Sequence, residues 1–116
     1  MEIQRFDPGP RLSRAVVYGD TVYLAGLTAD DLTQGVAGQT KQILTKIDGY
    51  LQKAGTDKSR LLTAQIWLSE IGTFDEMNSV WDVWIDKANP PARATVESKL
   101  AGPGYRVEIM VVAARR

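Results

Sequence analysis

The chain has 116 residues, 44% hydrophobic and 24% charged, which fits one globular domain and is too short for two. Its 14 basic and 14 acidic residues cancel, which argues against nucleic acid as the main partner, and no apolar run reaches the ~18 residues of a membrane span. Cysteine and histidine are both absent, which excludes disulfides, thiolate nucleophiles, Cys/His metal sites and catalytic triads with an imidazole base.

The N-terminal region is predicted to be rich in β-structure. Residues 2–6 form a candidate strand, and the turn-forming stretch 7–10 follows as a loop. Two further β-rich runs, 14–18 and 21–25, are separated only by Gly19-Asp20, a connection typical of a hairpin. The opening residues are polar and lack the apolar region of a secretory signal, so we expect a cytoplasmic protein.

A helical period begins near residue 35 and continues to about residue 54. Its apolar residues recur three and four positions apart, as expected for a helix that packs one face against a sheet. Gly55 suits a helix stop, whereas Gly49 inside the helix costs about 1 kcal/mol relative to alanine. The apolar stripe consists of Val36, Thr40, Ile43, Leu44, Ile47, Tyr50 and Leu51.

Residues 61–69 again alternate between two sets of side chains, which predicts a strand. The even-numbered residues 62–68, beginning with Leu62, would form its apolar face. The next segment opens with a capping-box pattern, residues 73–76, and predicts a helix to about residue 86. Trp81 and Trp84 have helical spacing on it, which favours core packing over a ligand cage. Proline at positions 90 and 91 ends this helix.

Two final strands are predicted at 93–98 and 105–113, joined through a turn at 102–104 that is too short for a phosphate loop. The order β-β-β-α-β-α-β-β predicts one α+β domain over residues 1–116, with a mixed sheet and both helices on one face. The other sheet face, which includes Trp67 and the even-numbered residues 106–112, then lacks a cover within the chain. A partly apolar open face is typical of an oligomer interface.

Arg93 is a candidate binding residue because it follows a stiff Pro-Pro corner. Its guanidinium is a planar fork that can bind a carboxylate with two hydrogen bonds. The alternative is a structural ion pair with an acid of a neighbouring strand. Thr95 points to the same strand face as Arg93. There it either hydrogen-bonds a ligand or simply favours the strand as a β-branched residue.

Glu108 is a candidate base because it lies within an otherwise apolar strand. Apolar neighbours would partly desolvate it, raise its pKa and make it a better base near neutrality. The alternative is a partner for Arg106 or for an arginine of another subunit. The pair Asp30-Asp31 has no third ligand nearby in sequence, which favours a solvated loop over a cation site.

Several short motifs, in order along nearly the whole chain, resemble the RidA (YjgF) family of reactive intermediate deaminases. They are Val22-Tyr23-Leu24-Ala25-Gly26, Gly38-Gln39-Thr40, the turn and strand 57–68, Phe74-Asp75-Glu76-Met77-Asn78, Pro91-Ala92-Arg93 and Val107-Glu108-Ile109. The resemblance implies a chorismate-mutase-like fold, a homotrimer, and ligand sites in clefts between subunits. It also implies cofactor-free hydrolysis of a small enamine or imine, such as 2-aminoacrylate, to a 2-keto acid and ammonia.

The resemblance also assigns roles to three residues. Arg93 matches the family arginine that pairs with the substrate carboxylate, and Glu108 matches the carboxylate associated with water activation. Asn78 matches a family asparagine near the cleft, although its local sequence favours a residue that only caps or braces a neighbouring loop. We therefore expect a small carboxylate substrate bound by Arg93, Thr95 and Asn78, with neither nucleic acid nor membrane as a partner and no metal.

Three positions depart from the family pattern and mark a divergent branch. Leu12 stands near the family's tyrosine, Ala25 replaces a serine, and Thr95 replaces a cysteine. These changes keep a second hypothesis open, in which the same trimer binds a small carboxylate or a protein partner without catalysis.

Overall fold

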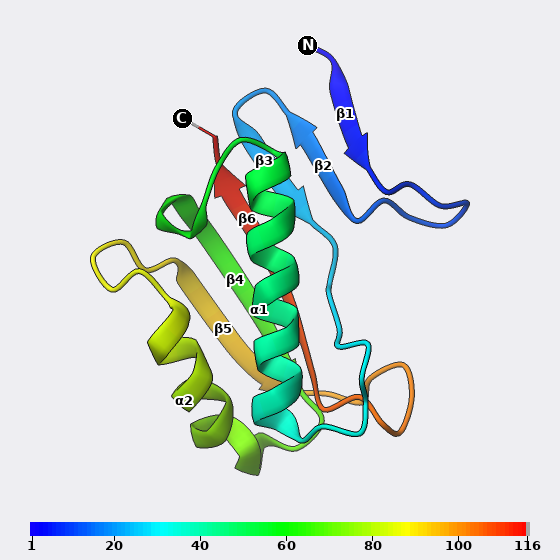
Figure 1. Ribbon diagram of the computed structural model, residues 1–116, viewed down its shortest axis with the longest axis vertical. Helices are drawn as coiled ribbons and strands as arrows, with labels where there is room; N and C mark the ends of the chain where they lie inside the picture. The colour runs from blue at the N-terminus through cyan, green and yellow to red at the C-terminus, as the bar shows by residue number, and fades with distance from the viewer. Residues whose placement is uncertain (116) are drawn as a thin grey trace.

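One six-stranded sheet carries two helices on the same face in the computed structural model, which describes residues 1–115 (Figure 1). The strand order is β1-β2-β3-β6-β4-β5. Strands β4 and β5 run parallel and the other neighbours antiparallel, so the predicted mixed sheet and element order are confirmed. The elements are β1 (Ile3–Phe6), β2 (Ala15–Tyr18), β3 (Thr21–Leu24), α1 (Val36–Lys53), β4 (Leu61–Leu68), α2 (Phe74–Trp84), β5 (Ala92–Glu97) and β6 (Val107–Ala114), with 3₁₀ turns at Lys58–Arg60 and Ile71–Thr73.

The first three strands form an antiparallel meander at one side of the sheet. The predicted hairpin is confirmed, since Tyr18 of β2 pairs with Thr21 of β3 across a two-residue turn. Gly19 adopts a φ of 61° there, a conformation that side chains rarely tolerate and that the tight turn requires. Strand β3 then pairs with β6, so the last strand lies inside the sheet between β3 and β4.

Helix α1 lies over the sheet and buries its predicted stripe; only Tyr50 of that stripe remains half-buried. Gln39 is also fully buried, which the periodicity did not predict. Its Nε2 donates to the carbonyl oxygens of Gln34 and Gly104 at 2.9 and 3.0 Å, and its Oε1 accepts from the Arg106 N–H at 2.9 Å. Gln39 therefore fastens the start of α1 to the segment that enters β6.

The predicted face of β4 is wrong at the start of the strand. Leu62 is 48% exposed, and Leu61 is buried in its place. A β-bulge between Leu61 and Thr63 shifts the pairing with β6 by one residue, and the side-chain alternation shifts with it. From Ala64 onward the even-numbered residues face the core, as predicted.

Helix α2 begins without the predicted capping box, and it ends at Trp84, two residues early. The Thr73 hydroxyl donates to the Glu70 carbonyl oxygen at 2.7 Å instead of capping the helix. Thr73 closes a 3₁₀ turn that runs straight into α2, so its backbone is not in the extended conformation that an N-cap uses. The predicted core role of Trp81 and Trp84 is confirmed, because their ring centroids lie 5.4 Å apart at the edge of the core.

The sheet face opposite the helices has no cover within residues 1–115, as predicted. We call it the open face. A shallow groove of about 710 Å³ crosses it, bordered by β4, β5 and β6. Apolar side chains on it are partly accessible to solvent, with Val96 43% and Met110 38% exposed. Its use as an oligomer interface stays a prediction.

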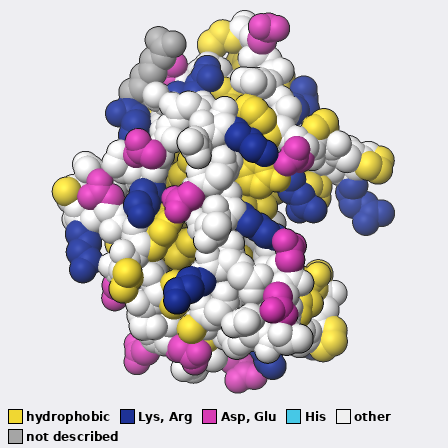
Figure 2. Space-filling model, in the orientation of Figure 1, with side chains coloured by type: hydrophobic (Ala, Val, Ile, Leu, Met, Phe, Trp, Pro, Cys, Tyr) yellow, Lys and Arg dark blue, Asp and Glu magenta, His cyan; other side chains and the backbone are white. Residues whose placement is uncertain are grey.

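The opposite, helix-bearing face shows acidic and basic side chains interspersed (Figure 2). This mixture agrees with the formal net charge of zero. None of the described helices is both long and apolar enough to cross a membrane.

Candidate functional site

Arg93 lies on the edge strand β5 and points toward the helix-bearing face, beneath α2. Its partner on β4 is the core residue Ala64, which fixes this orientation. The Nη1 atom donates to Oδ1 of Asn78 at 2.8 Å. The rings of Phe74 and Trp81 flank the guanidinium, with centroids 5.8 and 5.2 Å from its Cζ. Cation–π contacts and one hydrogen bond therefore hold the guanidinium in place.

The Arg93 cation has no carboxylate partner within the described chain. The alternative of a structural ion pair with a strand acid is therefore not observed. Partial burial lowers the pKa of Arg93, and the charge of Asp82 acts in the opposite direction. Because an arginine stays protonated in proteins, the result is a half-buried, unpaired cation. Such a cation favours an anionic ligand, since a bound carboxylate would offset its desolvation.

Thr95 shares the face of Arg93, as the strand alternation predicts. It pairs with the core residue Ile66, two positions along from the pair formed by Arg93 and Ala64. Its Oγ1 is buried and has no hydrogen-bond partner among residues 1–115. Native structures rarely leave a buried hydroxyl unpaired, so a water or a ligand atom is expected beside it, and both roles of Thr95 stay predictions.

Glu108 lies on β6 and faces the open side of the sheet, where it pairs with Trp67 of β4. Its carboxylate rests on Gly26, because a Cβ built on that glycine would lie 2.1 Å from Oε2. Partial burial raises the pKa of Glu108. Neither Arg106 nor any other described residue forms an ion pair or hydrogen bond with it. The intrachain alternative for Glu108 is therefore not observed.

The fold brings three of the four predicted site residues together. Arg93, Asn78 and Thr95 meet beneath α2, whereas Glu108 lies on the other side of the sheet. Within one chain, the side chains of Arg93 and Glu108 therefore point to opposite faces of the sheet.

The remaining candidates have ordinary local roles. Asp30 forms an ion pair with Lys46 at 2.8 Å, and Asp31 accepts hydrogen bonds from the backbone and hydroxyl of Thr33. Residues 102–104 form the predicted turn, which the Tyr105 N–H closes by donating to the Gly102 carbonyl oxygen at 3.3 Å. No group of three metal-binding side chains occurs in the part of the chain that the structure describes.

Comparison with known proteins identifies the family. The family model described as endoribonuclease L-PSP matches residues 2–115, essentially the whole chain. The chain is a RidA/YjgF-family protein. Its solved relatives share the fold: a YjgF-family protein of Neisseria meningitidis superposes with a TM-score of 0.97 at 40% identity, over 100% of this chain and 97% of the other. The chorismate-mutase-like α+β fold implied by the sequence is thereby confirmed.

Two curated relatives of this RidA/YjgF protein carry different kinds of name. A RutC family protein of Haemophilus influenzae is 43% identical over 114 residues, which cover 97% of this chain and 98% of the other. A 2-iminobutanoate/2-iminopropanoate deaminase of Bos taurus is 33% identical over 107 residues, which cover 87% of this chain and 77% of the other. The name of the first relative states no reaction, and the second relative is named as an imine deaminase.

Sequence reasoning missed two parts of the RidA/YjgF site region. Phe74 and Trp81 border Arg93, and their spacing from Asn78, four residues before and three after, places all three on one helix stripe. That spacing was the available signal, although it did not say which strand residue the stripe would meet. The contact between Gly26 and Glu108 joins distant parts of the chain and left no local signal.

Proposed function

We propose that this protein is a cofactor-free hydrolytic deaminase of small enamino and imino acids, which it converts to 2-keto acids and ammonia. The observation that carries the proposal is the half-buried Arg93 guanidinium, held by Asn78 and without an acidic partner in the described chain. The family membership and the imine deaminase among the relatives support it.

The substrate carboxylate would bind Arg93. One Nη1 proton is already donated to Asn78, which leaves the other guanidinium N–H groups for two parallel hydrogen bonds to a carboxylate. The Phe74 and Trp81 rings limit the motion of the guanidinium, so little ordering cost remains when the ligand binds. The buried hydroxyl of Thr95 offers a further hydrogen bond on the same side.

Glu108 of a second copy would activate the water. An enamine first tautomerises to its imine. The Glu108 carboxylate removes a proton from water as the oxygen attacks the imine carbon, and it returns this proton to the nitrogen to give a carbinolamine. The proton of the carbinolamine hydroxyl then passes to the nitrogen as the C–N bond breaks, so that ammonia leaves and a C=O bond forms. The raised pKa of Glu108 suits this role, because a general base works best when its pKa approaches the working pH.

The positions of the two groups support a contribution from two copies. Arg93 is on the outermost strand and Glu108 is on the open face, so an assembly that covers the open face can bring β5 of one copy to β6 of the next. A closed homotrimer is the assembly we propose, with one such cleft at each of its subunit contacts.

The test is ammonia release from freshly generated 2-aminoacrylate and a panel of 2-imino acids, measured with the purified protein. Arg93→Ala should lower kcat/KM by about 10²-fold or more, since a two-point charged contact is lost. Glu108→Gln should lower kcat by about 10²–10⁴-fold, the usual contribution of a general base. The exposed variants Arg5→Ala and Glu76→Ala serve as matched controls and should keep full activity.

A wild-type rate equal to the buffer rate over the whole panel would contradict the proposal. Binding of a 2-keto acid in calorimetry without any turnover would then identify a non-catalytic carboxylate binder. Because the matching family model is described as an endoribonuclease, RNA cleavage is assayed as well. Cleavage that survives Arg93→Ala and Glu108→Gln would point to a different site.

A further inference from the structure

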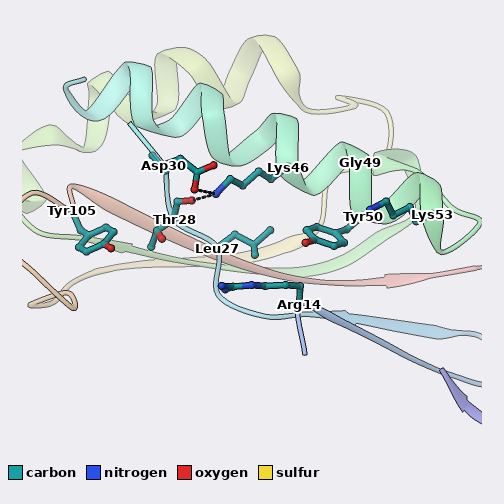
Figure 3. Close-up of a pocket in the computed structure, with 10 residues that line it drawn as sticks. Arg14, Leu27, Thr28, Asp30, Lys46, Gly49, Tyr50, Lys53 and Tyr105 are labelled. Atoms are coloured by element: carbon teal, nitrogen blue, oxygen red, sulfur yellow. Dashed lines mark hydrogen bonds and ion pairs between the residues drawn. The ribbon is translucent and has the colours of Figure 1, made fainter. Parts of the chain in front are cut away.

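A second groove lies on the helix-bearing side of the molecule, away from Glu108 and the open face. It measures about 570 Å³ and runs between the side of α1 and the segment 27–30, with Arg14 on the opposite side (Figure 3). Its lining includes three cationic side chains and two tyrosines but a single acid, Asp30. This composition differs from the evenly mixed charge elsewhere on the same face.

Two of the cations lie near Tyr50. The Lys53 Nζ lies 5.2 Å from the centre of the Tyr50 ring. The hydrogen bond to Asp7 raises the pKa of Tyr50, and the positive charge of Arg14 acts in the opposite direction. Neither Arg14 nor Lys53 forms an ion pair or a side-chain hydrogen bond with any described residue. Lys53 has an ordinary reason for its place, because a cation in the last helical turn is stabilised by the helix dipole. Arg14 has no such reason.

The third cation keeps part of its binding capacity. The Lys46 Nζ donates to the Thr28 carbonyl oxygen at 2.7 Å and to Asp30 at 2.8 Å, which leaves one of its three protons. The nearby acids are already engaged, since Asp30 accepts from Lys46 and Asp7 accepts from the Tyr50 hydroxyl at 2.6 Å. Three cations therefore stand against two carboxylates, Asp30 and Asp7, which leaves one positive charge in excess, and Arg14 and Lys53 keep unused donors.

A glycine keeps the groove open. Gly49 lies within α1, where glycine weakens the helix, and it borders the groove. A Cβ added there would meet no other atom within 4 Å, so close packing does not explain the glycine. The missing side chain leaves space directly between Lys46, Lys53 and Tyr50.

We propose that this groove binds a small phosphate monoester, with the phosphate between Arg14 and Lys53 and the organic group along Tyr50 toward Lys46. A phosphate dianion is bound well by arginine and lysine donors that approach from different sides, and the tyrosine ring offers a surface for a planar group. The site is separate from the one that holds Arg93, and the proposal does not depend on deaminase activity.

The test is calorimetric titration of the full chain with phenyl phosphate, inorganic phosphate and the dicarboxylate succinate. We expect saturable binding of phenyl phosphate with a dissociation constant of about 1 mM or tighter, and weaker binding of succinate. Arg14→Gln and Lys53→Gln should each weaken phenyl phosphate binding about fivefold or more, because each removes a charged hydrogen bond. Gly49→Leu, which fills the groove while keeping a good helix former, should abolish it.

Lys41→Gln removes an exposed cation from α1 outside the groove and should bind like the wild type. Arg93→Ala should also bind like the wild type, which separates this groove from the proposed deaminase site. Thermal unfolding of every variant checks that its fold is intact. The proposal would be overturned if binding did not saturate up to ~10 mM phenyl phosphate. It would also be overturned if Arg14→Gln and Lys53→Gln bound phenyl phosphate as tightly as the wild type. Equal affinity for succinate would overturn its assignment to phosphate.

Discussion

The Glu108 carboxylate is partly desolvated, and no described residue neutralises it. Partial burial disfavours its charged form, which is why its pKa is raised. A structural acid in this position would lower the stability of the fold at neutral pH without benefit. A group that accepts a proton during a reaction gains from the same environment, which supports the proposed role of Glu108 as a base.

The raised pKa of Glu108 leads to a prediction for the pH dependence of activity. The base must be ionised to act, so kcat/KM should rise with pH as Glu108 loses its proton. The midpoint should lie above the ~4.3 of a free glutamate, because the folded-state pKa is raised. Initial rates measured in overlapping buffers between acid and neutral pH would show this rise, the acidic limb of the pH–rate profile.

The Glu108→Gln variant is the control for that profile. Its residual activity should lack the acidic limb, while any pH effect on the substrate itself remains in both proteins. An identical limb in the two profiles would assign the titration to another group.

Gly26 gives a second prediction for single residues. A methyl group at this position would lie far inside contact distance of Glu108 Oε2, so Gly26→Ala should push the carboxylate away from its place. Since a misplacement of about 1 Å can cost ~10²-fold in rate, we expect a loss of about that size with little change in secondary structure.

Steady-state kinetics and circular dichroism would check the effect of Gly26→Ala. Gly72→Ala is the matched control, because a Cβ there meets nothing within 4 Å. Full activity of Gly26→Ala would show that the position of the carboxylate does not matter for the reaction.

Some of these residue contacts could be predicted from the sequence. The shared face of Arg93 and Thr95 follows from the two-residue period of a strand, and it is observed. The hydrogen bond between Arg93 and Asn78 depends on how α2 sits on β5, which local patterns do not contain. The contact between Gly26 and Glu108 depends on strand pairing across most of the chain.

Secondary-structure elements were predictable where one periodicity ran without interruption. Helix α1 and the hairpin of β2 and β3 follow this rule. The face of β4 could not be predicted at the start of the strand, because the bulge between Leu61 and Thr63 is a property of its pairing with β6. The capping motif before α2 failed for a similar reason, since the 3₁₀ turn that replaces it forms its own hydrogen bonds.

Gln39 provides a prediction for the junction of α1 and β6. Gln39→Leu keeps the side-chain size but leaves two carbonyl oxygens and one N–H without their buried partner. We expect a loss of about 2–4 kcal/mol in the free energy of unfolding, because unsatisfied buried polar groups cost about 1–3 kcal/mol each and some will find water.

Urea denaturation would measure the effect of Gln39→Leu. Gln52→Leu, at an exposed position of the same helix, should stay within about 0.5 kcal/mol of the wild type. Equal stability of the two variants would mean that the Gln39 hydrogen bonds contribute nothing net.

Helix α1 also contains a site for stabilisation. Gly49→Ala adds a methyl group in open space and reduces the freedom of the unfolded chain, so it should raise the free energy of unfolding by about 0.5–1 kcal/mol. The midpoint of thermal unfolding should rise by roughly 2–5 °C. A lower midpoint would reveal strain at Gly49 that its backbone geometry does not suggest.

The whole molecule has the two groups of the proposed site on opposite sides of one sheet. Arg93 lies under α2 and Glu108 on the open face. Sequence periodicity placed both residues in strands, and the resemblance placed ligand sites between subunits. Neither could give the geometry of the proposed contact between copies, because such a contact depends on surface shapes that form only after folding.

Mixing of variants tests whether two copies share each site. Arg93→Ala and Glu108→Ala, each inactive alone, should recover activity when they are unfolded and refolded together. In a closed ring with one group from each of two neighbours, random mixing in equal amounts leaves about one quarter of the sites intact. The deaminase rate of the mixture should therefore approach about a quarter of the wild-type rate.

The double variant with both substitutions is the control for this experiment. Mixed with either single variant, it should give no recovery, because no intact site can form. Failure of the two single variants to complement, in assemblies shown to be mixed, would contradict a shared site.

The separation of Arg93 and Glu108 by the sheet also has an evolutionary consequence, if each cleft is shared as proposed. A lineage could not become monomeric and keep its chemistry, however well each chain folded. Substitutions that loosen the association would be removed by selection for turnover, even where they touch neither reactive group. Quaternary structure and reactivity would then be inherited as one trait.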